Sequence, residues 1–216
     1  MSKNIGVVGS GPVGQVLAAG FLKHGFKVMI GTNTPAKQAE LRNTLGTGIS
    51  TGSFAETAAF GQIVVLAVKG DVAEKAIQAA GAHNLKGKTV IDTTNPIAAA
   101  PPTNGVLHFF TSFEESLMEK LQRLVPDAHF VKSFSCVGNA SMVNPDFGGV
   151  RPTMFLCGNN DAAKKEVKEI LGTFGWDHED MGKVEAARAI EPLCMLWCIP
   201  GFVQNRWSHA FKLLTK

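Results

Sequence analysis

Two hydrophobic patterns alternate along residues 3–135 of the chain. Short, continuous apolar runs are typical of strands buried on both faces of a sheet, and the run at 62–68 is the clearest. Segments with helical spacing lie between these runs. We therefore expect strands at 3–8, 26–31, 48–51, 62–68, 89–92 and 129–132, and helices at 13–22, 35–45, 53–59, 71–80 and 116–124. Asp71 is the expected N-cap of the fourth helix. This alternation predicts an α/β fold of the Rossmann type, a doubly wound parallel sheet with right-handed crossovers.

The pattern changes after about residue 134. We expect a strand at 153–157, an amphipathic helix at 162–174, and a mostly helical segment at 184–214 that Pro192 and Pro200 interrupt. The polar stretch at 178–180 is interpreted as a loop. We therefore expect one domain over residues 1–135 and a small, mostly helical C-terminal extension over 136–216, which is not an independent domain.

A glycine-rich turn joins the first predicted strand to the first predicted helix. Gly9 allows the tight turn, Gly11 leaves room for phosphates to approach the backbone, and Gly14 lets the helix pack closely on the strand. The helix N-terminus then offers free N–H groups and a positive dipole end to an anion. The spacing predicts that residues 1–135 bind a dinucleotide through Gly9, Ser10, Gly11, Pro12, Val13 and Gly14.

The residues at the end of the second predicted strand indicate which dinucleotide is expected to bind. An NAD site places an acid there for the ribose 2′-OH, but the first acid in this stretch is Glu40, inside the helix. Thr32, Asn33 and Lys37 could instead bind a 2′-phosphate, so we expect NADP(H). Ordinary helix capping by Thr34 and a solvated Lys37 are the structural alternatives.

Loops after the later strands supply further candidates. Val68 and Val72 follow the central strand and could pack on a cofactor ring, while Asn95 is either a ribose or carboxamide ligand or a turn residue. The segment at 133–139 mixes small polar and apolar residues and would face the nicotinamide, but no base that would activate Cys136 is evident. The loop at 98–105 is either a lid or a crossover detour.

Composition narrows the chemistry. The chain has 216 residues and a net charge of +3, too mild for nucleic-acid binding. No stretch reaches the roughly 18 apolar residues of a membrane span, the sequence begins directly with a strand, and the four cysteines lack metal-site spacing, so we expect a cytoplasmic protein without a metal. The chain has no tyrosine, which excludes the Tyr-x-x-x-Lys dehydrogenase route. Hydride transfer between stacked rings needs alignment more than a protein acid.

Several of these motifs resemble the NADP oxidoreductases that depend on the deazaflavin coenzyme F420, and also the cytosolic reductase domain of the six-transmembrane metalloreductases. The resemblance rests on the segments 9–14, 31–33, 90–96, 131–134, 187–193 and 210–214. It implies NADP(H) at the residues named above, with Asn139 near the carboxamide. It also implies that Ser135, Cys136 and Val137 lie where a flavin-like ring would stack. Family members usually carry arginine at the position of Asn33 and histidine near that of Ser135.

The sequence therefore predicts an NADPH-dependent oxidoreductase that passes hydride to a flavin, a deazaflavin or another small acceptor. A non-catalytic NADP(H)-binding redox sensor is the alternative. The resemblance also implies a homodimer formed through the C-terminal helices, to which the apolar stretch at 193–197 is suited, although the core of the chain itself would suit it equally.

Overall fold

A single sheet of eight strands runs through the molecule. The computed structural model describes residues 3–46 and 48–216. The strand order is β3-β2-β1-β4-β5-β6-β7-β8. The strands are β1 (Asn4–Val8), β2 (Lys27–Gly31), β3 (Ile49–Gly52), β4 (Ile63–Leu66), β5 (Thr89–Asp92), β6 (His129–Lys132), β7 (Thr153–Gly158) and β8 (Asp177–Asp180). Strands β1 to β6 pair in parallel, as predicted, whereas β7 joins β6 antiparallel. The sheet is therefore mostly parallel, and the C-terminal region extends it by two strands.

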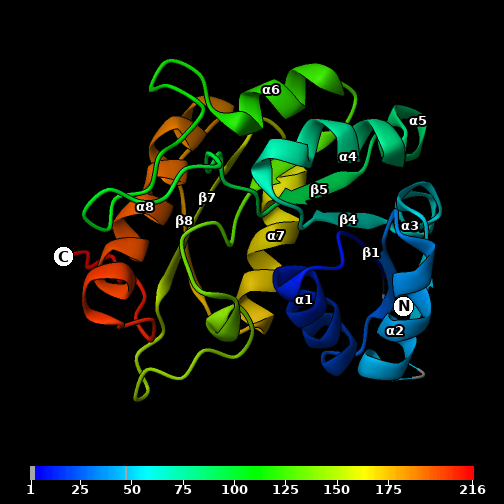
Figure 1. The fold of residues 1–216 in the computed structure, drawn as a ribbon, viewed down its shortest axis with the longest axis horizontal. Coiled ribbons are helices and arrows are strands. Elements are labelled where there is room, and N and C mark those ends of the chain that lie inside the picture. The colour runs from blue at the N-terminus through cyan, green and yellow to red at the C-terminus, as the bar shows by residue number, and fades with distance from the viewer. Residues whose placement is uncertain (1–2, 47) are drawn as a thin grey trace.

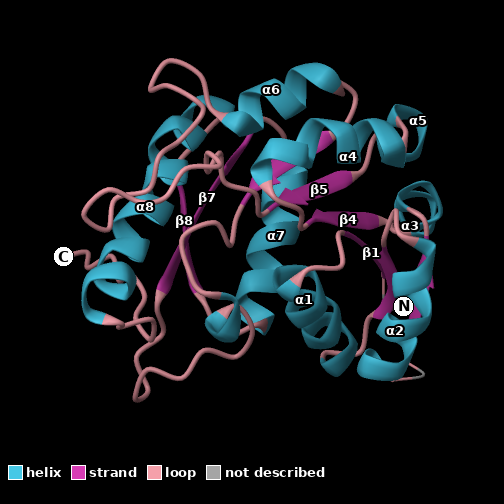
Figure 2. Ribbon diagram, viewed as in Figure 1, coloured by secondary structure: helices cyan, strands magenta, loops and turns pink. Residues whose placement is uncertain are grey.

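Helices cover both faces of this sheet (Figures 1 and 2). One face packs on α1 (Pro12–Lys23), α2 (Pro35–Leu45) and α7 (Asp161–Thr173). The other face packs on α3 (Phe54–Phe60), α4 (Ala73–Ala80), α5 (Ala82–Leu85), α6 (Leu117–Leu124) and the start of α8 (Ala187–Gln204). Three short 3-10 turns, η1 (Gly70–Val72), η2 (Asn139–Ser141) and η3 (Val184–Ala186), complete the described elements.

The central strands are largely apolar because each of their faces meets a helical layer. Neighbouring residues of one strand enter opposite cores: Val65 lies in the α1–α7 core and Leu66 in the α3–α6 core. The same division occurs in β6 between Val131 and Phe130. This two-sided burial confirms the interpretation of the apolar runs as central parallel strands.

Three local predictions are wrong. Asp71 does not cap α4, because the chain first forms η1 and Val72 occupies the N-cap position without a side-chain bond. Residues 177–180 form the edge strand β8, which pairs with β7. Helix α8 runs unbroken through Pro192 and Pro200 and ends at Asn205, whose φ is 51°. An interior proline removes one N–H donor and crowds the carbonyl four residues earlier, so packing must hold α8 across both positions. Ile190 and Leu193 flank Pro192 in the core, and the Trp207 ring packs on Gly201 next to Pro200.

The chain beyond α8 is not helical and folds back over it. Trp197 of α8 stacks on His209 with ring centroids 4.9 Å apart, and its indole N–H donates to the His209 carbonyl over 2.8 Å. The Thr153 N–H then donates to the Phe211 carbonyl over 2.8 Å. Cys194 and Trp197 are thereby buried within the chain, whereas Leu196 between them is exposed.

One helical segment, Val184–Gln204, is long and apolar enough by composition to cross a membrane. A third of it is buried inside the fold. The prediction that no segment passes this test is therefore wrong for α8. The buried carboxylate of Glu191 nevertheless places the first turns of α8 within the protein core.

Helices α6 and α8 are joined by a shared carboxylate. Ser116 and Glu119 form a capping box at the start of α6, and Arg188 of α8 donates from Nη2 to Glu119 Oε1 over 2.6 Å. The guanidinium hydrogen bonds, reinforced by the Ser116 bonds and opposed by burial, lower the pKa of Glu119 from 4.5 to about 2. Stability from this carboxylate is therefore present above pH 4.5 and is lost as the pH falls toward 2.

Replacing Glu119 by glutamine tests this link. We expect the variant to lose about 1–2 kcal/mol of unfolding free energy at neutral pH, after allowance for solvent screening. The difference from the natural chain should shrink as the pH falls from 4.5 toward 2, because the unfolded chain is protonated at Glu119 below about 4.5 but the folded chain only near 2. Urea unfolding at pH 7, 4.5 and 3 measures it, and a difference that stays constant over this range would contradict the assignment.

Candidate functional site

Close backbone contacts build the glycine turn between β1 and α1. Gly9 has φ +122°, and a Cβ there would lie 2.2 Å from the Ala67 carbonyl oxygen. A Cβ on Gly14 would lie 2.1 Å from the Gly9 oxygen, so α1 packs directly on the turn. Gly11 differs, because a Cβ there would meet no atom within 4 Å. Gly9 and Gly14 thus serve packing, whereas Gly11 leaves open space at the N-cap of α1.

A cavity of about 650 Å³ lies over this turn. Its walls are the segments that follow β1, β2, β4 and β5. It therefore opens at the carboxyl edge of the parallel strands, between the paired strands β1 and β4, where the strand order reverses. The predicted residues that line it are Gly9, Ser10, Gly11, Pro12, Val13, Thr32, Asn33, Val68 and Asn95. The structure therefore brings most of the predicted cofactor-binding set into one cavity.

The β2 end of the cavity carries polar groups and no acid among the described lining residues. Thr32 is buried, and its hydroxyl accepts the Thr34 N–H over 3.2 Å. Asn33 and Thr34 are exposed at the mouth, beside the α2 N-terminus, which has no side-chain cap bond. Lys37 is exposed within the first turn of α2, outside the lining set. The arrangement leaves polar groups and helix N–H groups to receive an anion at this end.

Phe54 is a lining residue that the sequence did not reveal. It is the first residue of α3 and borders the same end as Thr32. The sequence analysis assigned no functional role to the short strand at 48–51 or to the helix after it. No sequence feature therefore pointed to Phe54 as a lining residue. Its ring adds an apolar wall beside the polar groups.

The β5 end of the cavity is held by hydrogen bonds. Thr93 donates its hydroxyl hydrogen to the Leu66 carbonyl over 2.9 Å, and Asn95 Nδ2 donates to the Ser135 carbonyl over 2.7 Å. Asn95 Oδ1 is buried without a hydrogen-bond partner among the described residues. Residues 97–99 also line the cavity, so the loop at 98–105 begins as part of its wall.

Other predicted residues lie outside the lining of this cavity. Ser135, Cys136 and Val137 are buried beneath it, and burial raises the pKa of the Cys136 thiol to about 12. A thiol with that pKa is a poor nucleophile at neutral pH. Val72 is exposed on η1, and Asn139 is half-buried at the start of η2. Roles for these five residues toward an acceptor or cofactor stay predictions.

The cavity is poor in acid–base groups. Among its described lining residues only Lys69 and Asp71 carry charge, and both are exposed at the rim. Within residues 3–46 and 48–216, His, Cys, Asp and Glu form no cluster suited to a metal ion. The arrangement fits a phosphate-bearing ligand better than an independent acid–base mechanism.

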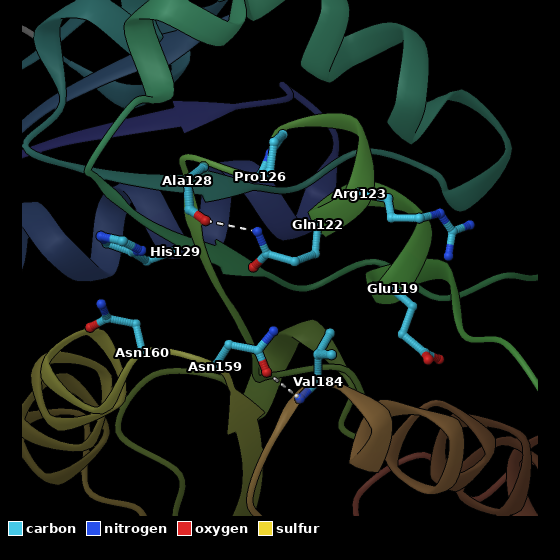
Figure 3. A pocket seen from close by; sticks show the side chains of 9 residues that line it. All are labelled: Glu119, Gln122, Arg123, Pro126, Ala128, His129, Asn159, Asn160 and Val184. Atoms are coloured by element: carbon cyan, nitrogen blue, oxygen red, sulfur yellow. Dashed lines mark hydrogen bonds between the residues drawn. The ribbon is translucent and has the colours of Figure 1, made fainter.

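A second cavity of about 510 Å³ lies at the opposite edge of the sheet, beside the first residue of β6 (Figure 3). Its polar side chains already serve the fold. Gln122 Nε2 donates to the Ala128 carbonyl over 2.9 Å, and Asn159 Oδ1 accepts the Val184 N–H over 3.0 Å. The glycine-rich cavity therefore remains the candidate site.

The site and fold together define a dinucleotide-binding α/β protein. Residues 4–96 match the model of the family described as NADP oxidoreductase, coenzyme F420-dependent. A crystal structure of a candidate F420-dependent NADP reductase from Arthrobacter sp. FB24 is 29% identical, with a TM-score of 0.92 over 100% of both chains. The resemblance stated from the sequence motifs is thereby confirmed.

Two other relatives have names that describe different activities. Metalloreductase STEAP3 of Rattus norvegicus is 27% identical over 91% of this chain and 38% of its own length. The NADPH-dependent reductive aminase of Aspergillus oryzae is 31% identical over 44% of this chain and 32% of its own length. The chain thus spans well under half the length of these relatives. Both names describe reductive enzymes, and that of the Aspergillus relative states a dependence on NADPH, but the names differ in what is reduced.

The different roles of two glycines can be separated by mutation. Gly14→Ala forces a methyl group against the Gly9 carbonyl, so we expect a loss of about 3 kcal/mol or more of unfolding free energy. Gly11→Ala has ordinary backbone angles and open space, so we expect a change within about 1 kcal/mol. Chemical unfolding of both variants measures the contrast. Equal losses would show that the turn is packed differently.

Proposed function

We propose that this protein is an NADPH-dependent oxidoreductase that transfers hydride between NADP(H) and a flavin, a deazaflavin or another small acceptor. The observation that carries the proposal is the open space at Gly11, in a cavity that joins a free helix N-terminus to an acid-free β2 end. When bound, NADPH supplies the hydride from its nicotinamide ring.

The lining residues suit each part of NADP(H). Ser10, Gly11, Pro12 and Val13 offer backbone to the pyrophosphate at the start of α1. Asn33 and Thr34, with Lys37 one turn away, suit the 2′-phosphate. Because the adenosine half then extends toward β2, the nicotinamide half extends toward Thr94 and Asn95 at the β5 end.

The acceptor is inferred from what the cavity lacks. Reduction of a carbonyl or an imine needs a proton donor near the reacting atom, and the described lining offers only Lys69, at the rim. Hydride transfer to a flavin-like ring needs alignment and exclusion of water instead. This supports a ring acceptor over the imine substrates suggested by the name of the Aspergillus relative.

A panel of acceptors tests this function directly. We expect purified protein to bind NADPH with micromolar or better affinity and to oxidise it with FMN, FAD or coenzyme F420 in preference to a cyclic imine. A ferric chelate belongs in the panel because of the metalloreductase relatives. Tight binding without turnover would favour the redox sensor, while preferential turnover of the imine would overturn the choice of acceptor.

Cofactor preference can be tested at the exposed Asn33. Asn33→Asp places a carboxylate where the 2′-phosphate should lie, so we expect NADPH affinity to fall on the order of tenfold with NADH affinity unchanged. Asn43→Asp is the matched control, because it adds the same charge to the exposed surface of α2 roughly 12 Å further along the helix. Fluorescence titration with both nucleotides measures the ratio. If the ratio of NADPH to NADH affinity is unchanged in Asn33→Asp, the 2′-phosphate does not bind at this end of the cavity.

The homodimer and the cytoplasmic location stay proposals. Exposed Leu196, Phe202 and Val203 on α8 give the dimer a candidate apolar surface. Sedimentation of the natural chain would establish its mass in solution.

A further inference from the structure

A fully buried lysine lies behind the β5 end of the cavity. Lys132, the last residue of β6, has no exposed side-chain surface. Its ammonium group donates to the Thr94 carbonyl over 2.8 Å and forms ion pairs with Asp92 Oδ2 over 2.7 Å and Glu191 Oε1 over 2.9 Å. We call Lys132, Asp92 and Glu191 the buried ionic triad.

Both carboxylates of the triad have further partners. Asp92 Oδ1 accepts the Thr94 N–H over 2.9 Å and the Thr94 hydroxyl over 2.7 Å. Glu191 accepts the N–H groups of Leu117 and Met118, each over 3.0 Å, at the positive end of α6. Burial acts to lower the pKa of Lys132, but Asp92 and Glu191 outweigh it and raise the pKa to about 12. The lysine is therefore charged at every pH at which the protein would work.

Such a triad is a costly way to fill a core. Buried ion pairs are often no more stabilising than apolar side chains of equal volume, because each charge loses its hydration. Their distinguishing property is direction, since every donor and acceptor fixes the position of its partner. The partner common to Lys132 and Asp92 is Thr94, whose N–H, hydroxyl and carbonyl are all bound from the protein interior.

Thr94 is also part of the cavity wall. Thr94 and Asn95 line the cavity at the end assigned above to the nicotinamide, and Asn95 is anchored separately to the Ser135 carbonyl. The triad thus lies one residue layer behind the cavity and holds the backbone from which Asn95 projects. It does not line the cavity itself.

We propose that Lys132 is a positioning residue, which with Asp92 and Glu191 fixes the Thr94–Asn95 wall against the nicotinamide half of NADP(H). The inference rests on the proposed function, because it takes NADP(H) as the ligand. It assigns to the first turns of α8 a part in orienting the reactive ring, although Glu191 never touches it.

Two ligands separate positioning from general stability. NADPH reaches the Thr94–Asn95 wall, whereas 2′,5′-ADP, the adenosine half alone, does not. In Lys132→Met we expect 2′,5′-ADP affinity to stay within twofold of the natural chain, while NADPH affinity falls about tenfold. The bound nicotinamide ring should also become more mobile, as measured by time-resolved fluorescence anisotropy.

Because Lys132→Met leaves two buried carboxylates unpaired and can prevent folding, Thr94→Val gives a milder test. It removes only the hydroxyl bond to Asp92, and we expect about a threefold loss for NADPH with none for 2′,5′-ADP. Thr94→Ser keeps the hydroxyl and should restore NADPH affinity. Lys164→Met is the matched control, since Lys164 is also buried and paired with Asp180, but lies on α7 outside the cavity lining.

The outcomes distinguish the two proposals. If the natural chain binds neither ligand, the proposed function fails and the positioning role fails with it. If the natural chain binds both ligands, the NADP(H) site on which both proposals depend is supported. The positioning role is then overturned if the Thr94→Val and Lys132→Met variants that fold weaken both ligands equally or neither, or if Lys164→Met produces the same selective loss.

Discussion

The contact between the Gly9 carbonyl and Gly14 fixes the geometry on which the site depends. It allows the first turn of α1 to lie directly against the end of β1, so that the helix N-terminus points into the cavity and not over its rim. The turn is also pressed against Ala67 at the end of β4. One set of backbone contacts thus places β1, α1 and β4 around the point where strand order reverses.

On the far side of the cavity, charged groups in the core take the place of close backbone packing. Lys132 and Asp92 hold Thr94 through three hydrogen bonds, and Glu191 connects the same lysine to α6 and α8. The two walls therefore differ in their physical basis. The glycine wall is specified by steric exclusion, whereas the Thr94 wall is specified by the directions of ionic hydrogen bonds.

The sequence predicted best where periodicity and burial agree. Strands β5 and β6 and helix α2 have the predicted bounds. Each of the two strands has a buried apolar centre between polar ends, and a Thr-Pro pair marks the start of the helix. Strand β8 has the sequence Asp-His-Glu-Asp and no apolar alternation, so only its pairing with β7 makes it a strand. Lys132 lies in the segment 131–134 that contributed to the resemblance, but nothing marked it as buried, because a lysine that ends a strand is ordinarily exposed. Its two carboxylate partners, Asp92 and Glu191, are 40 and 59 residues away in the chain.

Helix α8 supports the β5 end of the cavity at two places. Glu191 in its second turn supports Thr94 through Lys132. Nearer its end, Val203 packs so closely on Gly105 that a Cβ there would lie 2.7 Å from Val203 Cγ2. The loop that includes Gly105 begins at Ile97, which lines the cavity and bridges to Phe109. One helix therefore braces two consecutive parts of the wall, at Thr94 and at the loop after it. A helix broken at Pro192 or Pro200 would separate these two supports, so its continuity through both prolines is part of how the site is built.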